Sequence, residues 1–217
     1  MSICVVTSII DIPGSEGEKY SDLISPCTES KISYCNKHGY DLLINRLWIH
    51  PEKHPSWNKL LTLKNCMSKK YDYLFWMDAD TLITNPEIKL ETILDQCNSK
   101  YDLHFTRDAH NGPFNCGVFF MRVDEYVCDL FEACLKLWEQ YQDCQWEQSA
   151  LVRMYNNNEC GLKERLQIID EQRLFNSFCC STPQMICWQP GDFLIHFAGI
   201  RGDSLKMNIS RVLDLIK

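Results

Sequence analysis

The chain has little positive charge and no long apolar run. Its 22 lysines and arginines are outnumbered by 29 aspartates and glutamates, which gives a net charge of −7. The basic residues form no stripe of the kind that binds nucleic acid. No apolar segment has the length of a membrane span or of a signal peptide. We therefore expect no nucleic-acid partner, no membrane span and a cytoplasmic location.

The thirteen cysteines lack the paired C-x-x-C spacing of zinc fingers and redox motifs. Most of them lie among apolar neighbours, as Cys4, Cys66 and Cys134 do. Small reduced thiols packed in a core are typical of this pattern and of a reducing compartment. We expect nearly all of the cysteines to be reduced.

Short apolar runs alternate with helical patterns along the 217 residues, with no internal repeat. Strands are expected at 3–9, 40–46, 71–77, 101–106, 116–123, 166–169 and 192–198. Helices are expected at 29–39, 56–70, 124–141 and 146–155, and from 204 onward, with Gly39 as a C-cap and Ser56 and Asp124 as N-caps. The alternation predicts one α/β domain over residues 1–217, with a mainly parallel central sheet covered by helices on both faces.

One apolar run ends in two acidic residues separated by a small one, Asp78, Ala79 and Asp80. Ligands of open α/β sheets bind beyond the carboxyl ends of the strands. In an extended chain, residues i and i+2 project to the same side with α-carbons roughly 6–7 Å apart, so both carboxylates can face one ion. Oxygen ligands favour Mg²⁺ or Mn²⁺, and such an ion attracts a diphosphate. The alternative is a turn with two solvated acids.

A histidine lies within a later apolar run, in the segment GDFLIHFAG at 191–199. A lone histidine in such a run is usually a core residue. Mn²⁺ accepts imidazole as well as carboxylate, so Asp78, Asp80 and His196 are candidates for a shared metal site.

Four segments, FWMDADTLI, FNCGVFFMR, WEQSALVRM and GDFLIHFAG, occur in this order. Together they resemble the GT-A glycosyltransferases, which use nucleotide-sugar donors. The similarity is strongest to the galactosyl/xylosyltransferase family of yeast mannan and plant xyloglucan enzymes, and extends from Ile3 to about Gly202. The chain is shorter than those Golgi enzymes, so it also resembles cytosolic virus-encoded or bacterial relatives, and it can be one part of a larger polypeptide.

The resemblance implies a GT-A fold that transfers a sugar from a UDP-sugar donor to a glycan acceptor with Mn²⁺ or Mg²⁺. It implies an N-terminal part that binds the nucleotide and a C-terminal part on the metal and acceptor side. The donor and metal positions that it implies are Thr7 near the uridine, Lys59 on the donor side, Asp78 near the ribose and metal, Ala79 beside the donor, Asp80 and His196 on the metal, Asn115 and Gly117 near the sugar, Gly199 at the diphosphate turn, and Arg201 or Lys206 as a phosphate contact.

Catalytic candidates also follow from the resemblance. Glu147 and Gln148 match an acid-glutamine pair beside the anomeric carbon. If the reaction inverts configuration, Glu147 or Asp108 is the candidate general base; if it retains configuration, Gln148 facing the sugar suffices. The family resemblance favours retention. Glu147 has a second interpretation, as an acid placed at a helix N-terminus by the helix dipole.

Two other function classes remain open from the sequence. A nucleotidyltransferase or sugar-phosphate hydrolase also places paired acids on a metal, although no early glycine-rich phosphate loop is present. A carbohydrate-binding module without activity would use the six tryptophans for sugar stacking.

Overall fold

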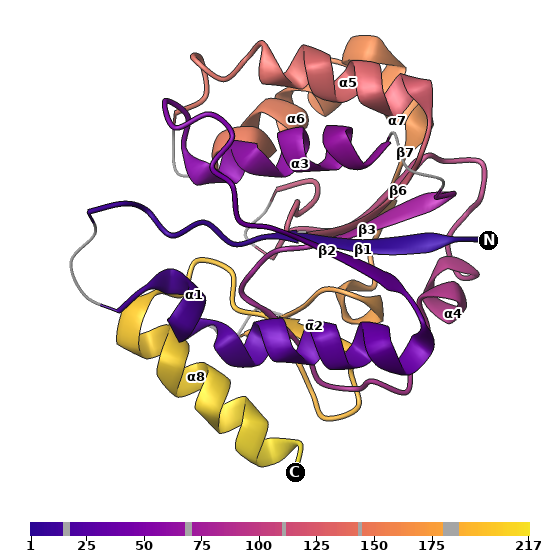
Figure 1. Ribbon diagram of the computed structural model, residues 1–217. Coiled ribbons are helices and arrows are strands. Elements are labelled where there is room, and N and C mark those ends of the chain that lie inside the picture. Colours follow the sequence, from indigo (N-terminus) through magenta and orange to yellow (C-terminus); the bar gives the residue numbers. More distant parts are fainter. Residues whose placement is uncertain (15–17, 68–70, 110–111, 143–144, 180–186) are drawn as a thin grey trace.

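The central sheet has six strands in the order β2-β1-β3-β6-β5-β7 in the computed structural model shown in Figure 1. The structure describes residues 1–14, 18–67, 71–109, 112–142, 145–179 and 187–217. The six strands are β1 (Ile3–Ser8), β2 (Asp41–Asn45), β3 (Tyr73–Met77), β5 (Leu103–Thr106), β6 (Val118–Arg122) and β7 (Leu166–Ile169). Strand β6 runs antiparallel to β3 and β5, whereas β1 pairs parallel with β2 and β3, and β5 with β7. The predicted mainly parallel sheet is confirmed.

Helices cover both faces of this sheet, as predicted (Figure 1). The upper layer contains α3 (Asn58–Met67), α5 (Glu125–Leu135), α6 (Trp146–Asn156) and α7 (Leu162–Arg165). The lower layer contains α1 (Tyr20–Leu23), α2 (Ser25–His38), α4 (Leu90–Leu94) and α8 (Gly202–Leu215). The described residues also form three short 3₁₀ helices, η1 (Pro55–Trp57), η2 (Glu159–Gly161) and η3 (Gln172–Leu174).

Alternate residues of each strand face the two layers. In β1, Cys4 and Val6 belong to the core under α3 and α5, whereas Ile3 and Val5 belong to the core over α2 and α4. Successive side chains of a strand point to opposite faces, so a strand covered on both sides is apolar throughout. This explains why the strand segments of the sequence are continuous apolar runs.

A second, smaller sheet contains β4 (Thr81–Ile83), β9 (Leu194–His196) and β8 (Ser177–Phe178), in the order β4-β9-β8. Strand β9 lies within the apolar run expected at 192–198, and it belongs to this small sheet rather than to the central sheet. It pairs antiparallel with β4, with Thr81 opposite His196. Strands of two or three residues give no periodic pattern, so β4 and β8 were not expected.

Two of the three expected helix caps are confirmed. Gly39 ends α2 with a φ of 75°, and the Asp124 carboxylate accepts a hydrogen bond of 2.7 Å from the backbone N–H of Tyr126. The expectation for Ser56 is wrong, because the ring of His54 caps η1 by accepting from the Ser56 N–H. The end expected for that helix, at residue 70, lies outside the described residues.

Ten cysteines in the described part of the chain are free thiols, whereas Cys187 is disulfide-bonded. Cys187 is therefore an exception to the expected reduced state. Among the described residues, no helix combines the length and the apolar character needed to cross a bilayer.

Burial raises the pKa of Cys4 to about 11 and that of Cys27 to about 12, while Cys160 is exposed. Because the thiolate is the reactive form, iodoacetamide at pH 8 should label Cys160 first and leave Cys4 and Cys27 unlabelled until urea is added. Peptide mass spectrometry over a time course measures the order. Labelling of Cys27 as fast as Cys160 in the native protein would contradict the packing described above.

Candidate active site

A cleft of about 600 Å³ opens at the carboxyl ends of β1 and β3. It is lined by residues from six segments, namely 8–12, 18–23, 54–59, 76–80, 146–147 and 199–205. These segments come from both helical layers and from both ends of the sequence. The cleft therefore lies where the sheet topology predicts a ligand site.

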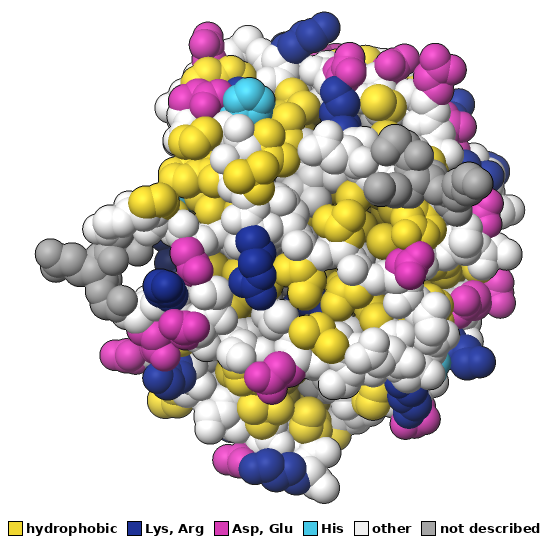
Figure 2. All heavy atoms as spheres, viewed as in Figure 1, with side chains coloured by type: hydrophobic (Ala, Val, Ile, Leu, Met, Phe, Trp, Pro, Cys, Tyr) yellow, Lys and Arg dark blue, Asp and Glu magenta, His cyan; other side chains and the backbone are white. Residues whose placement is uncertain are grey.

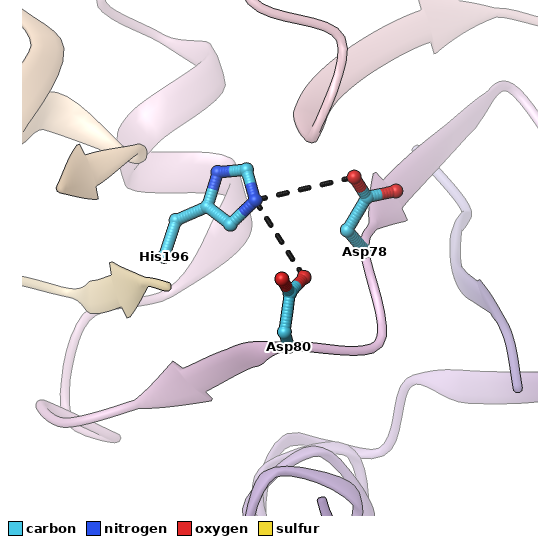
Figure 3. A group of neighbouring side chains, drawn as sticks. All are labelled: Asp78, Asp80 and His196. Carbon is cyan, nitrogen blue, oxygen red and sulfur yellow. Dashed lines mark ion pairs between the residues drawn. The ribbon is translucent and has the colours of Figure 1, made fainter. Parts of the chain in front are cut away.

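Three possible metal ligands meet at this cleft. Nε2 of His196 lies 3.6 Å from a carboxylate oxygen of Asp80 and 4.0 Å from one of Asp78 (Figure 3). One ligand atom from each residue lies within 4.8 Å of the others. The antiparallel pairing of β4 with β9 brings them together, because Thr81, which follows Asp80, is opposite His196.

The charges of this group fit a cation. Burial, followed by the charge of Asp78, raises the pKa of Asp80, although the neighbouring His196 acts in the opposite direction. Two carboxylates that share a partly dehydrated space repel each other, so a bound cation lowers their energy. Two carboxylates and one imidazole form a donor set that Mn²⁺ accepts.

The orientation of the His196 ring is set by Asn176, which the sequence analysis missed. Nδ1 of His196 is 3.1 Å from the side-chain oxygen of Asn176, an acceptor, so the proton lies on Nδ1 and the Nε2 lone pair faces the carboxylates. The amide nitrogen of Asn176 donates to Asn115, and that of Asn115 donates to Asp108. A buried chain of hydrogen bonds thus runs from Asp108 to His196.

The backbone of Gly117 lies against the Cε1 edge of the same ring. A β-carbon at this position would lie 2.0 Å from Cε1 of His196. A side chain therefore cannot be added here unless the imidazole moves. The structure gives Gly117 this role in supporting His196, beside the sugar contact that the resemblance implies.

Gly117→Ala should lower the free energy of unfolding by about 1–3 kcal/mol, because the added methyl group overpacks the ring. In a His196→Ala background the same substitution should cost less than about 0.5 kcal/mol, because the ring is gone. Urea unfolding of the two single variants and the double variant measures this coupling. Equal costs of Gly117→Ala in the two backgrounds would show that the ring is not the constraint.

Lys59 lies at the centre of a buried polar cluster. Its ammonium group is 2.8 Å from Glu147, 3.1 Å from Asp78 and 2.7 Å from the Cys116 carbonyl oxygen. Burial by itself lowers the pKa of Lys59, but the charges of Asp78 and Glu147 outweigh burial and raise it. Lys59 is therefore a buried cation that holds both acids. Its side chain is therefore not that of an ordinary helix lysine exposed to solvent.

Asp78 is held in one orientation by two donors. The oxygen that forms the ion pair with Lys59 also accepts a 2.7 Å hydrogen bond from the indole N–H of Trp76, and the other oxygen of Asp78 faces His196. Gln148, next to Glu147, accepts a 2.8 Å hydrogen bond from the backbone N–H of Cys116. Gln148 thus contacts the FNCG segment directly, whereas Glu147 is linked to it through Lys59.

Other expected positions differ in their access to the cleft. Ala79, Gly199 and Arg201 line it. The Thr7 side chain is fully buried and its hydroxyl has no hydrogen-bond partner among the described residues, whereas the adjacent Ser8 lines the cleft. The ammonium group of Lys206 is 3.2 Å from Glu18.

Asp108 is buried and lies outside the residues that line the cleft. Its carboxylate accepts a hydrogen bond of 3.1 Å from the side-chain amide of Asn115. It therefore contacts the site through Asn115 and Asn176.

A second buried lysine, Lys31 on α2, holds the turn that carries the two aspartates. Its ammonium group donates to the backbone oxygens of Cys27, Ala79 and Thr81 at 3.3, 3.2 and 2.5 Å. Burial lowers its pKa. The sequence analysis missed Lys31 because a lysine in a polar helical segment normally faces solvent.

Lys31→Met should lower the free energy of unfolding by about 1–3 kcal/mol at pH 7, because buried carbonyl groups lose their donor. The pKa of Lys31 in the folded chain is lower than its pKa in the unfolded chain, which is near 10.5. The unfolded state therefore binds more protons between those two values, and the contribution of Lys31 to stability rises with pH in that window.

The measurement is urea unfolding at several pH values between 7 and 10 for wild type, Lys31→Met and Lys37→Met. Lys37 is an exposed lysine on the same helix that pairs with Glu87. The difference between wild type and Lys31→Met should grow with pH, while the difference for Lys37→Met should not. If the difference between wild type and Lys31→Met shrinks as the pH rises, the predicted direction of the pH dependence is wrong.

Comparison with known proteins identifies the fold and the family. The fold is that of the GT-A glycosyltransferases. It matches a glycosyltransferase involved in glycosylation of the major capsid of PBCV-1 with a TM-score of 0.74 at 16% identity, covering 96% of this chain and 99% of that one. It matches the galactosyltransferase LgtC with a TM-score of 0.59 at 14% identity, covering 98% and 94%. At these identities the likeness concerns the fold alone.

The sequence matches the galactosyl transferase GMA12/MNN10 family over residues 2–100 and 95–203, and the chain belongs to this family. Galactomannan galactosyltransferase 1 of Cyamopsis tetragonoloba is 30% identical over 119 residues, which cover 52% of this chain. The match covers 27% of the length of that relative. The resemblance inferred from the four sequence segments is thus confirmed.

Proposed function

We propose that the chain transfers a sugar from a UDP-sugar donor to a hydroxyl group of a carbohydrate acceptor, with Mn²⁺ or Mg²⁺ as cofactor. The observation that carries this proposal is the group of Asp78, Asp80 and His196 at the cleft, within a chain that belongs to a galactosyltransferase family. Galactomannan in the name of a relative favours a polysaccharide acceptor.

In this proposal Asp78, Asp80 and His196 hold the ion, which would neutralise charge that develops on the leaving diphosphate. Lys59 and Trp76 fix Asp78 so that one oxygen remains directed at the site. Gly199 has a φ of 75°, in the left-handed region that favours glycine, and forms a turn beside the diphosphate. Arg201, at the N-terminus of α8, is the proposed phosphate contact.

We propose retention of configuration. Glu147 forms a buried ion pair with Lys59, which opposes its use as a general base, and Asp108 does not line the cleft. Gln148 and Asn115 are then the residues proposed beside the sugar.

We also propose that residues 1–217 act as a single domain and function in the cytoplasm. Support for one domain comes from the cleft, which draws on segments from near both ends of the chain. Support for the cytoplasm comes from the ten free thiols in the described part.

Asp80→Asn should reduce Mn²⁺-dependent UDP binding by at least about 100-fold, because one of three protein ligands loses its charge; loss of a group that merely supports a ligand already costs about 10–100-fold. The measurement is calorimetry with UDP, with and without Mn²⁺. Asp95→Asn, at the C-cap of α4, is the matched control, because this aspartate is exposed, and it should leave UDP affinity unchanged. Full UDP affinity in Asp80→Asn would overturn the metal site.

A screen of UDP- and GDP-sugars for Mn²⁺-dependent donor hydrolysis tests the reaction without an acceptor. Release of UDP together with free sugar supports a transferase. Release of a nucleoside monophosphate would instead indicate a nucleotidyltransferase or hydrolase, and binding of glycans without any turnover would indicate a binding module.

A further inference from the structure

A second hollow of about 380 Å³ adjoins the cleft. Its volume lies within the range of about 300–1,000 Å³ that is usual for small-molecule sites. Its walls come from the segment after β2, from η1 and from the segment between α5 and α6. Figure 2 shows hydrophobic side chains gathered beside a histidine on the upper part of the molecule, where Figure 1 places these segments.

Aromatic rings form much of this hollow. Trp48, Trp57, Trp138 and Trp146 line it together with His54. The rings of His54 and Trp146 are stacked, with centroids 3.5 Å apart and planes within 2°. The backbone of Trp146 has a φ of 40°, which is a strained value for a large side chain. The strained backbone places the indole between the hollow and the cleft.

Polar groups lie beside these rings. The ammonium group of Lys53 is 4.7 Å from the centre of the Trp138 ring, and the indole N–H of Trp48 donates to the Lys53 carbonyl oxygen at 3.1 Å. The side chains of Glu52 and Gln142 add acceptors and donors at the rim. Flat apolar surfaces next to hydrogen-bonding groups suit a sugar ring, which has an apolar face of C–H groups and a polar edge of hydroxyl groups.

The hollow and the cleft share part of their lining. Ile12, His54, Pro55 and Trp146 belong to both. A ligand in the hollow therefore extends toward Asp78 and Asp80 across the stacked rings. The lining of the hollow contains neither aspartate of the metal group, and its acid, Glu52, disfavours a phosphate.

We propose that this hollow binds a pyranose ring of the acceptor glycan, stacked on Trp48 and Trp138. The proposal rests on the proposed function, since it assigns an acceptor to that same reaction. It adds a subsite away from the reacting hydroxyl group, so the enzyme should bind oligosaccharides more tightly than single sugars.

The test uses Trp48→Ala and Trp138→Ala, because these tryptophans line the hollow and not the cleft. Trp188→Ala is the matched control: it removes an equally large ring that is partly buried elsewhere, against β4 and β9. Mannohexaose and cellohexaose are the probes, and binding is measured by calorimetry in the presence of UDP and Mn²⁺. Melting temperatures identify any variant that fails to fold.

We expect at least one hexasaccharide to bind wild type, with its affinity reduced about tenfold or more in Trp138→Ala and Trp48→Ala and within about twofold of wild type in Trp188→Ala. The UDP affinity of Trp48→Ala and Trp138→Ala shows separately whether the cleft still binds its own ligand. Binding of UDP but of neither hexasaccharide by wild type would overturn the subsite, as would equal losses in Trp188→Ala.

Failure of the proposed function gives a different result. If UDP does not bind and no donor is hydrolysed, the transferase assignment fails, whereas hexasaccharide binding that depends on Trp138 would still support the hollow as a sugar site. If Trp138→Ala weakens UDP and leaves hexasaccharide binding unchanged, the hollow belongs to the nucleotide and the acceptor proposal is wrong.

Discussion

The site depends on positive charge that the fold buries beneath three acidic side chains. Asp78, Asp80 and Glu147 lie in or beside the cleft, and their mutual repulsion would open a site that lacked cations. Lys59 approaches from α3 in the upper layer and pairs with Asp78 and Glu147. Lys31 approaches from α2 in the lower layer and binds the backbone of the same turn. One turn is therefore held from both helical layers, which keeps the two aspartates in place in the absence of a metal.

The turn also joins two sheets. Asp78 follows β3 of the central sheet, and its backbone N–H donates to Gly117 at 2.7 Å. Asp80 precedes β4 of the small sheet, and its carbonyl oxygen accepts from Phe197 at 3.1 Å. Each aspartate is thus tied through its backbone to a different sheet. The geometry of the metal group is consequently set by how the two sheets meet, since the turn itself spans only three residues.

The sequence contained enough information for the central sheet and for the meeting of Asp78, Asp80 and His196, but not for the reason that they meet. Continuous apolar runs identify strands buried on both faces, and these were found. His196 reaches the aspartates through the pairing of β9 with β4, and β4 is too short to leave a period. Lys31 and Asn176 were missed because their roles depend on tertiary contacts, and a polar residue in a sequence does not show whether it is buried.

The segment Asn115-Cys116-Gly117 shows why one position of a motif can vary while its neighbours carry the structure. Asn115 acts through its side-chain amide, which bridges Asp108 and Asn176. Gly117 acts through its lack of a side chain, which leaves room for the ring of His196. Cys116 acts through its backbone, since its carbonyl oxygen binds Lys59 and its N–H binds Gln148. A hydrogen bond made by backbone atoms does not depend on the side chain of the same residue. The contacts to Lys59 and Gln148 therefore do not depend on the thiol of Cys116.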